Sequence, residues 1–370
     1  MKKIILTGGG TAGHVAPNLA LVPSLKAAGF EVYYIGSHAG IERELVEAEG
    51  IPYFGISSGK FRRYKSLKNI TDIFRVCKGL TDAIGILRKI RPDVVFSKGG
   101  FVVVPVIAAA RLLKVKSVIH ESDMTPGLAN KLAMPFTTKV CVSFPETLNH
   151  VKGKGVLTGT PLRSELFGGS REAGLMVFEN VDGCNSTGTK MKPVENVPSD
   201  TKPVLLVTGG SQGAKAINAC VREALPQILQ KFRVIHLCGK GNLSGINQHG
   251  YVEFEYLTQQ MADVLAAADI IISRAGANTI FELVALGKPN LLIPLPLGQS
   301  RGDQIQNAAS FEKQGFSMVL PESEMTPERL LQDISILYEN QRKYCQKMKM
   351  QNVANGVENV IDVIMSTVTT

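Results

Sequence analysis

The stretch that decides the fold is residues 3–14, KIILTGGGTAGH, near the start of the chain. Residues 3–7 are predicted to form a buried strand, and the glycines that follow form a loop. A helix is predicted from about residue 15 to residue 28, ended by Gly29, and a second strand at residues 31–35. The chain therefore opens as an α/β unit.

The same succession of strand, glycine loop and helix recurs further along the chain. Strands are predicted at residues 92–96, 116–120, 203–208, 234–238, 270–273 and 290–294. Short apolar strands that alternate with helices predict βαβ units and parallel sheets. Two such halves joined by a linker would leave a cleft at the carboxyl ends of their strands, where ligands of these folds bind.

Composition excludes several classes of protein. With 370 residues, 44% hydrophobic and 20% charged, the chain can bury sizeable cores, so whole-chain disorder is excluded. Its six cysteines are scattered without a C-x-x-C pair, which disfavours a disulfide framework or a zinc knuckle. Neither a signal peptide nor a run of about 18 apolar residues is present, and we expect a soluble cytoplasmic protein.

Charge and composition divide the chain into four parts. Residues 1–165 carry a net charge of +11, and the rest carries −2, which indicates domains with different partners. Residues 166–202 are rich in Gly, Ser, Thr, Asn and Pro and are predicted to be a linker with a polar insertion, to which we assign no function. Residues 203–340 form the second α/β domain, and residues 341–370 form C-terminal helices.

The first glycine loop, residues 8–13, matches the pattern G-x-G-x-x-G and favours an anion at the helix start. A dinucleotide site would also need an acid near the end of the second strand, but that strand ends at residues 34–37 without one, which disfavours NAD. His14 follows the loop at the helix start, whose field favours a neutral imidazole that accepts a proton. A packed or solvated histidine is the alternative.

The second glycine loop, residues 209–213, also follows a strand. It is not a P-loop, because Ala214, Lys215 and Ala216 follow where Gly-Lys-Ser/Thr is needed. A tight strand–helix turn and a cradle for a diphosphate both remain open.

The third loop, residues 273–279, has small residues that let backbone amides approach a phosphate. Glu282 lies one turn into the following helix, where its carboxylate can accept both hydroxyls of a ribose or simply complement the helix dipole. Residues 303–307 add amide groups suited to a sugar. Because no D-x-D occurs, a metal-bridged diphosphate lacks its usual ligands, and Arg163 is the candidate cation.

Residues 60–91 hold ten Lys or Arg and two Asp, beside a predicted helix at residues 67–87. An ordinary helix packed on the sheet explains most of its apolar face, which comprises Ile70, Ile73, Phe74, Cys77, Leu80, Ile84 and Leu87. The positive charge predicts reversible docking on an anionic membrane surface, through Arg62, Arg63, Lys65, Lys68 and Phe74. Nucleic acid is disfavoured as a partner, because aromatic residues are few and no binding module is recognisable.

Five motifs, taken in order, resemble the MurG family of glycosyltransferases, which is family 28, over nearly the whole chain. They are residues 8–14, residues 120–123 with 126–131, residues 159–163, residues 209–214, and residues 274–279 with Glu282.

The resemblance implies a GT-B fold, in which two Rossmann-like parallel-sheet domains face a cleft. It implies inverting transfer of GlcNAc from UDP-GlcNAc, bound mainly by the C-terminal domain, to the C4 hydroxyl of the MurNAc-pentapeptide of lipid I, giving lipid II in peptidoglycan synthesis. No cofactor or metal is expected. The enzyme would be peripheral at the cytoplasmic face of the cell membrane, with its last helices crossing back to the N-terminal domain.

The resemblance also assigns roles residue by residue. His14, or a carboxylate that it positions, is the candidate general base. The residues implied in donor binding are Thr11, Ala12, Gly13, Asp123, Arg163, Ser211, Leu257, Ala277, Asn278, Thr279, Glu282 and Gln304. The loops implied for the acceptor diphosphate contain Gly9, Gly10, Gly99 and Gly100.

Two residues depart from the family pattern. A glycine commonly stands where this chain has Ala12, and an asparagine where it has Asp123. Either the contact with the sugar is kept with a hydrogen-bond acceptor, or the affinity for the donor substrate is altered. A nucleotide-sugar epimerase on the same fold and an inactive sugar-nucleotide sensor or scaffold at the membrane remain as alternatives.

Overall fold

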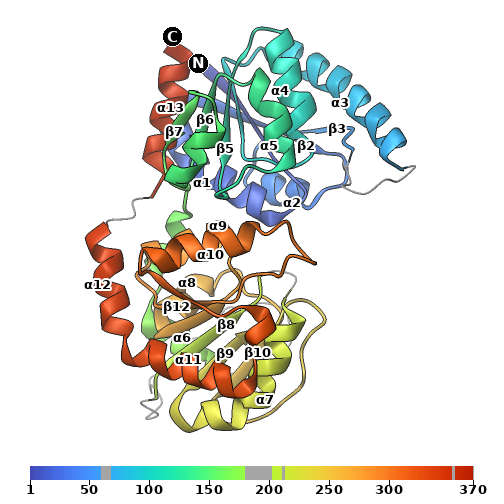
Figure 1. Cartoon of the computed structure of the whole chain (residues 1–370). Coiled ribbons are helices and arrows are strands. Elements are labelled where there is room, and N and C mark those ends of the chain that lie inside the picture. Colours follow the sequence, from blue (N-terminus) through green and yellow to red (C-terminus); the bar gives the residue numbers. More distant parts are fainter. Residues whose placement is uncertain (60–67, 180–201, 211–212, 352–354, 370) are drawn as a thin grey trace. The chain divides into compact units, whose positions relative to one another are not determined.

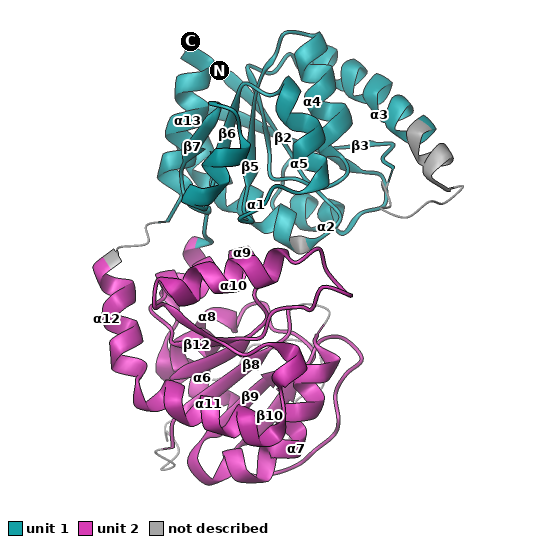
Figure 2. Cartoon of the chain, in the orientation of Figure 1, with its two compact units in different colours: residues 1–163, 354–370 teal, residues 164–353 magenta. Residues whose placement is uncertain are grey.

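The computed structural model describes residues 1–59, 68–179, 202–210, 213–351 and 355–369. The chain divides into two compact units, coloured separately in Figure 2. Unit 1 comprises Met1–Arg163 and Ala354–Thr370, and unit 2 comprises Ser164–Val353. Each unit is a parallel sheet with helices on its faces (Figure 1), which confirms the predicted α/β class.

Unit 1 is built, in its described residues, on a seven-stranded parallel sheet in the order β3-β2-β1-β4-β5-β6-β7. Its strands are β1 (Lys2–Thr7), β2 (Phe30–Ser37), β3 (Tyr53–Ile56), β4 (Val94–Ser97), β5 (Lys116–Glu121), β6 (Lys139–Val142) and β7 (Gly155–Leu157). Its helices before α13 are α1 (Ala12–Ala27), α2 (Ile41–Ala48), α3 (Lys68–Ile90), α4 (Val103–Leu112), α5 (Leu128–Ala133), η1 (Met134–Phe136) and η2 (Pro145–His150). Because β1 pairs with both β2 and β4, the strand order changes direction there, and the loops after β1 and β4 lie at one edge of the sheet.

The last helix of the chain, α13 (Val357–Thr369), belongs to unit 1. Val360 and Ile364 are fully buried and share a core cluster with Ile4 and Leu6 of β1. By contrast, α12 (Gln341–Gln351) belongs to unit 2. The structure therefore divides the predicted C-terminal range of residues 341–370 between the two units.

Unit 2 contains, in its described part, a six-stranded parallel sheet in the order β10-β9-β8-β11-β12-β13. Its strands are β8 (Val204–Thr208), β9 (Arg233–Leu237), β10 (Tyr251–Phe254), β11 (Ile270–Ser273), β12 (Asn290–Leu292) and β13 (Ser317–Val319). Its helices besides α12 are η3 (Ser164–Gly168), α6 (Arg171–Leu175), η4 (Met176–Phe178), α7 (Lys215–Lys231), α8 (Met261–Ala267), α9 (Ala277–Ala285), α10 (Asp303–Lys313), η6 (Glu322–Glu324) and α11 (Pro327–Glu339). The core strands β8 and β11 pair side by side, so their loops are neighbours.

The prediction of a linker over residues 166–202 is wrong for its first third. There α6 packs against α8 within unit 2. Gly174 makes this possible, because a Cβ at that position would overlap the Asp263 carbonyl oxygen of α8. Arg171 then donates to the Ala267 carbonyl oxygen at 2.6 Å and to the Asp269 carboxylate at 3.0 Å. The glycine serves close helix packing here, not chain flexibility.

Candidate functional site

The two glycine loops of unit 1 lie in direct backbone contact. Gly100 has a φ of +93°, and a Cβ at this position would overlap the carbonyl oxygen of Gly9. A side chain at Gly10 would meet the Phe101 ring at 3.4 Å. The predicted acceptor loops, containing Gly9, Gly10, Gly99 and Gly100, are therefore brought together at the carboxyl ends of β1 and β4.

His14 lies half-buried in the first turn of α1, close to the second of these loops. A Cβ at Gly99 would lie 3.3 Å from both Nδ1 and Cε1 of the His14 ring. The backbone N–H of His14 donates to the Thr11 carbonyl oxygen at 3.1 Å, which closes the first turn of the helix. Because Gly99 has no side chain, the imidazole can rest against the β4–α4 loop.

Glu42, which sequence reasoning missed, holds the first glycine loop in place through a hydrogen bond to its backbone. The side chain is fully buried, and its carboxylate accepts from the backbone N–H of Gly10 at 3.2 Å and of Ser37 at 3.0 Å. Burial alone would raise the pKa of Glu42, but these bonds and one from the Ser37 hydroxyl outweigh it and hold the pKa below its usual value. A Cβ at Gly9 would lie 2.5 Å from Glu42 Oε1, so the glycine makes room for the acid.

This acid stands close to where a dinucleotide site would place its ribose ligand, at the end of β2. Both of its oxygens instead accept hydrogen bonds from the protein. The signal was present in the sequence, since Glu42 follows Ser37 by five residues across a short glycine-containing turn. Glu42 therefore serves the loop, and its oxygens are already engaged by protein donors.

The segment after β5 carries Asp123 and is organised by Glu121. The buried Glu121 carboxylate accepts from the N–H groups of Asp123 at 3.0 Å and Gly127 at 2.9 Å, and from the Asn130 side chain at 2.9 Å. Burial and the nearby charge of Asp123 raise the pKa of Glu121 above its usual value despite these bonds. Asp123 itself is half-buried.

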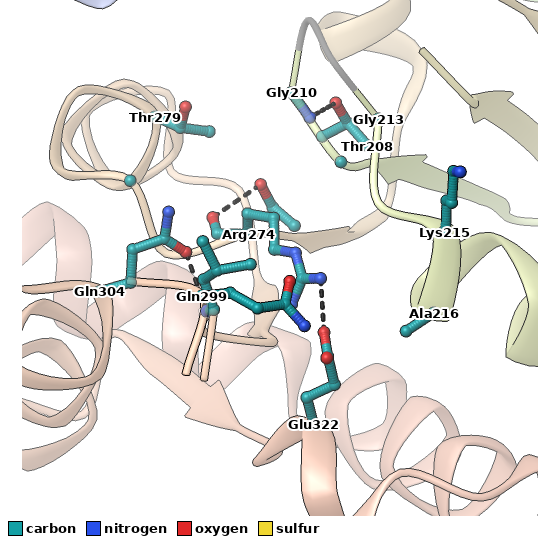
Figure 3. A pocket seen from close by; sticks show the side chains of 14 residues that line it. Thr208, Gly210, Gly213, Lys215, Ala216, Arg274, Thr279, Gln299, Gln304 and Glu322 are labelled. Carbon is teal, nitrogen blue, oxygen red and sulfur yellow. Dashed lines mark hydrogen bonds and ion pairs between the residues drawn. The ribbon is translucent and has the colours of Figure 1, made fainter. Parts of the chain in front are cut away.

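Unit 2 contains a pocket of about 710 Å³ at the carboxyl ends of β8 and β11. Figure 3 shows the side chains from both strands, from α9, from α10 and from the β12–α10 segment that face it. The residues that line it are Thr208, Gly209, Gly210, Gly213, Lys215, Ala216, Ser273, Arg274, Gly276, Thr279, Leu295, Gln299, Gln304 and Glu322. Its volume is in the range of sites for small molecules.

Two cations line this pocket, and they differ in their surroundings. The Arg274 guanidinium forms an ion pair with Glu322 at 2.5 Å and donates to the Ile293 carbonyl oxygen at 3.2 Å (Figure 3). Lys215 is exposed at the first residue of α7, two residues after the last glycine of the second glycine loop. Glu322 thus compensates the charge of Arg274, which forms part of the pocket wall. Lys215, by contrast, lies at a helix start, where an anion would bind.

The predicted donor-binding residues fall into three groups. Thr279 and Gln304 line the pocket, and the Gln304 side-chain oxygen accepts from the Leu295 N–H at 3.0 Å. Ala277 and Asn278 begin α9, Glu282 lies half-buried one turn later, and Leu257 packs on the core of unit 2. Ser211 lies outside the described residues, and the remaining five, all in unit 1, are Thr11, Ala12, Gly13, Asp123 and Arg163.

Several pocket residues were absent from the predicted set, notably Thr208, Lys215, Arg274, Gln299 and Glu322. Lys215 had a readable signal, because it lies two residues after the last glycine of the loop, at a helix start. Glu322 had none, because it is distant in sequence from every glycine loop and reaches the pocket only through the fold.

The membrane-facing prediction is only partly covered by the structure. Arg62, Arg63 and Lys65 lie outside the described residues, and so does the side chain of Lys68 at the start of α3. Phe74 is 70% exposed and Cys77 is exposed, whereas Leu80, Ile84 and Leu87 pack on the core of unit 1. Of the described side chains on the expected apolar face, the last three pack on the core, whereas Phe74 and Cys77 do not. No helix among the described residues has an apolar stretch of the length a bilayer crossing needs.

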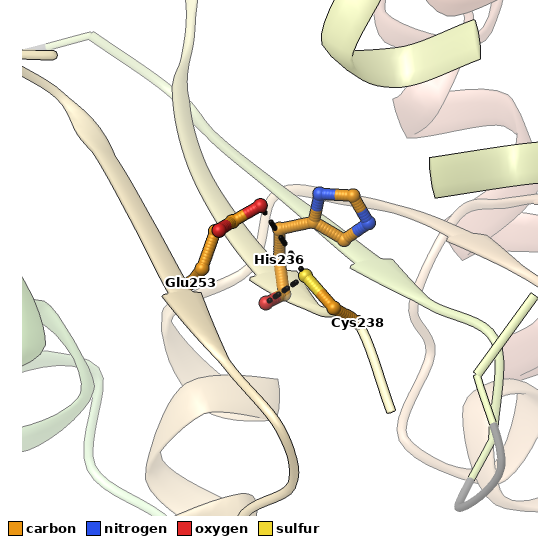
Figure 4. A group of neighbouring side chains, drawn as sticks. All are labelled: His236, Cys238 and Glu253. Atoms are coloured by element: carbon orange, nitrogen blue, oxygen red, sulfur yellow. Dashed lines mark hydrogen bonds between the residues drawn. The ribbon is translucent and has the colours of Figure 1, made fainter. Parts of the chain in front are cut away.

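A cluster of possible metal ligands lies near the glycine loop of unit 2 (Figure 4). Ligand atoms of His236, Cys238 and Glu253 lie within 4.8 Å of one another. However, the two His236 nitrogens are bonded to the Tyr251 hydroxyl at 2.9 Å and the Asn218 side-chain oxygen at 3.0 Å.

Charge also disfavours a cation in this cluster. Arg222 pairs with Glu253 at 2.7 Å. Burial raises the pKa of Cys238 to about 12, so its thiol stays protonated, and burial with the Arg222 charge lowers that of His236 to about 4. The cluster is a structural network, and Asn218 extends it by donating to the Cys238 carbonyl oxygen at 2.9 Å beside Gly213.

Comparisons with known proteins agree with this architecture. The sequence model of the glycosyltransferase family 28 N-terminal domain matches residues 4–142, and that of the C-terminal domain matches residues 204–364. The chain is 54% identical, over 98% of its length and 99% of the relative, to the UDP-N-acetylglucosamine--N-acetylmuramyl-(pentapeptide) pyrophosphoryl-undecaprenol N-acetylglucosamine transferase of Clostridium botulinum (strain Loch Maree / Type A3). It is 53% identical to a Clostridium tetani protein of the same name, over 98% and 97% of the two chains. The crystal structure of Acinetobacter baumannii MurG superposes with a TM-score of 0.74 at 25% identity, covering 99% of this chain and 100% of that one.

Proposed function

The chain belongs to glycosyltransferase family 28, and from that premise we propose that it transfers GlcNAc from UDP-GlcNAc to the C4 hydroxyl of the MurNAc-pentapeptide of lipid I, giving lipid II. The observation that carries the proposal is the 54% identity with the clostridial transferase over almost the full length of both chains. Two family domains in the same order and a MurG crystal structure of the same fold support it. The reaction is a step of peptidoglycan synthesis and hence of cell-wall biogenesis.

The donor nucleotide is assigned to the pocket of unit 2. The glycine loop after β8, the start of α9 and the exposed Lys215 offer favourable surroundings for a diphosphate. Glu282 is assigned to the ribose hydroxyls, and Thr279 and Gln304 to further donor contacts.

Further donor contacts are assigned by the resemblance alone. They comprise Ser211, Leu257, Ala277 and Asn278 in unit 2, and Thr11, Ala12, Gly13, Asp123 and Arg163 in unit 1.

The acceptor and the proton transfer are assigned to unit 1. The glycine loops with Gly9, Gly10, Gly99 and Gly100 are assigned to the diphosphate of lipid I, because their backbones meet at one sheet edge. His14 beside them accepts the proton of the C4 hydroxyl as that oxygen attacks the anomeric carbon. The new C–O bond forms as the bond to UDP breaks, with inversion at that carbon, and the proton remains on the imidazole.

Lipid I is anchored in a bilayer, so the enzyme needs a membrane-docking surface. We assign this role to the start of α3, where Phe74 is 70% exposed, together with the basic residues Arg62, Arg63, Lys65 and Lys68. The protein is then peripheral at the cytoplasmic face of the cell membrane.

The test is to incubate the protein with labelled UDP-GlcNAc and a lipid I analogue. The proposal expects a labelled lipid-linked disaccharide and an equal amount of UDP. Conversion of UDP-GlcNAc without the acceptor would identify an epimerase instead. Tight binding of UDP-GlcNAc without any turnover would identify a sensor or scaffold, and either result would refute the proposed transfer.

A further inference from the structure

Lys98 is a buried lysine for which the proposed reaction has so far no role. It directly follows β4, and its side chain is only 2% exposed. Its Nζ lies 2.8 Å from Nδ1 of His120 and donates to the Ser122 hydroxyl. The lysine therefore links the end of β4 to the end of β5.

The hydrogen bonds around His120 fix which ring nitrogen carries the proton. His120 Nε2 lies 2.8 Å from the carbonyl oxygen of Gly159, which can only accept. Nε2 must therefore carry the proton, and Nδ1 of the neutral ring is left to accept from Lys98. Burial, followed by the charge of Lys98, lowers the pKa of His120 well below its usual value, so the ring stays neutral.

The titratable groups that interact with Lys98 come from two neighbouring strands. Glu121 ends β5 and Asp123 follows it, and Cys141, whose thiol is kept neutral by burial, lies on β6. Burial lowers the pKa of Lys98 to about 7, and these groups oppose the shift. Lys98 is thus expected to ionise near neutral pH, within range of the charge of Asp123. The family commonly has an uncharged asparagine where this chain has Asp123.

The loop anchored by Lys98 is the one that contacts His14. The next residue, Gly99, would place a Cβ 3.3 Å from the His14 ring, and Gly100 lies against Gly9. A change in the hydrogen bonds of Lys98 therefore shifts the backbone of Gly99 and Gly100, and this shift moves the His14 imidazole, the proposed general base. An amine buried this deeply acts on the substrate only through such neighbours.

We propose that Lys98 is a positioning residue for the transfer reaction, whose ammonium group ties the loop of residues 98–100 to His120 and Ser122 and so sets the place of the His14 imidazole. This inference rests on the proposed function. It assigns to Lys98 a part in turnover and none in binding UDP, because the pocket assigned to the nucleotide lies in unit 2.

The test compares Lys98→Met with the wild type in the lipid I transfer assay. Methionine matches the apolar stem of the lysine side chain and removes its charged amino group. We expect kcat to fall by roughly 10- to 100-fold, the cost of a small misplacement of a reacting group, with an unchanged Kd for UDP.

The pH profile separates positioning by the ammonium group from mere packing. Because the ammonium form makes charge-assisted hydrogen bonds to His120 and Ser122 that are stronger than those of the neutral amine, wild-type kcat should fall as pH rises through about 7. This falling limb should be absent in Lys98→Met. In Ser122→Ala the ammonium loses one acceptor, so its pKa drops further and the limb should move to lower pH.

Lys288→Met provides the matched control in unit 2. This half-buried lysine donates to the carbonyl oxygens of Ala266 and Ala268, and its pKa is also lowered by burial. Its replacement should leave the limb unchanged.

The outcomes distinguish this inference from the proposed function. A wild-type protein without transfer activity refutes the function itself. A working wild type with a Lys98→Met variant of equal kcat and an unchanged falling limb overturns the role of Lys98. If Lys98→Met does not fold, the Ser122→Ala profile decides, since an unmoved limb contradicts the proposal.

Discussion

At the scale of single residues, the two candidate sites are built by different means. In unit 1, the fully buried Glu42 fixes the Gly10 backbone, and Gly99 leaves room for the His14 ring. In unit 2, Glu322 neutralises Arg274, while Lys215 stays exposed beside the glycine loop. Glu42 and the half-buried Glu322 thus stabilise the walls of the two sites, and the exposed Lys215 is left for the ligand.

The role of Lys215 can be tested by binding alone. Lys215→Met should weaken UDP binding about tenfold, because a charged hydrogen bond to phosphate contributes about 1.5–3 kcal/mol and 1.4 kcal/mol is tenfold in Kd. Calorimetric titration with UDP measures the effect. Lys231→Met, at the other, exposed end of α7, is the control and should bind as the wild type does. Equal affinities of both variants would remove Lys215 from the donor site.

Sequence reasoning at this scale found residues that follow glycine loops and missed those that reach them through the fold. His14, Thr279 and Gln304 were found from local patterns. Glu42 was missed because its carboxylate turns back toward the preceding strand end, and Lys98 because nothing in its local sequence shows that its amine is buried against His120.

At the scale of elements, most buried strands could be predicted and the edge strands could not, although the buried interior strand β6 was also missed. Predicted strands at residues 116–120 and 270–273 correspond closely to β5 and β11, whose residues are almost entirely buried. The strands β3, β7 and β13 are three or four residues long and partly exposed, so they give little apolar periodicity. Likewise α1 begins at Ala12 and not at residue 15, because the glycine-rich sequence there obscures the helix start.

The exposed Phe74 of α3 leads to a prediction about membranes. Phe74→Ser should reduce co-sedimentation with phosphatidylglycerol vesicles by roughly tenfold or more, since burying a phenylalanine side chain contributes about 1.5–3 kcal/mol. Leu297→Ser, which alters an equally exposed residue of unit 2, is the control and should leave co-sedimentation unchanged. If both variants bind vesicles as well as the wild type, α3 is not the docking element.

At the scale of the whole molecule, the C-terminal segment of the chain belongs to the same unit as the N-terminal segment. The helix α13 supplies Val360 and Ile364 to the core of unit 1, and Asn355 before it bonds with the backbone N–H of Leu162 at 2.9 Å. The family resemblance implied such a return, and composition alone gave no sign of it. Unit 1 is therefore discontinuous in sequence, and unit 2 is inserted between its two segments.

This pairing of chain ends predicts a stability effect. Ile364→Ala removes a fully buried side chain and should lower the free energy of unfolding of unit 1 by about 2–5 kcal/mol. Asp362→Ala, on the exposed face of the same helix, should change it by no more than about 0.5 kcal/mol. Urea unfolding of the full chain measures both, and equal midpoints would show that α13 does not stabilise unit 1.

The most direct test of the whole account is the His14→Ala variant, measured for both turnover and donor binding. The account predicts that kcat for transfer to a lipid I analogue falls by roughly 10²–10⁴-fold, while the Kd for UDP stays as in the wild type. His150→Ala, which alters an exposed histidine of unit 1, should keep full turnover. Near-normal turnover in His14→Ala would contradict the account, because the acceptor's proton would then be taken by another group.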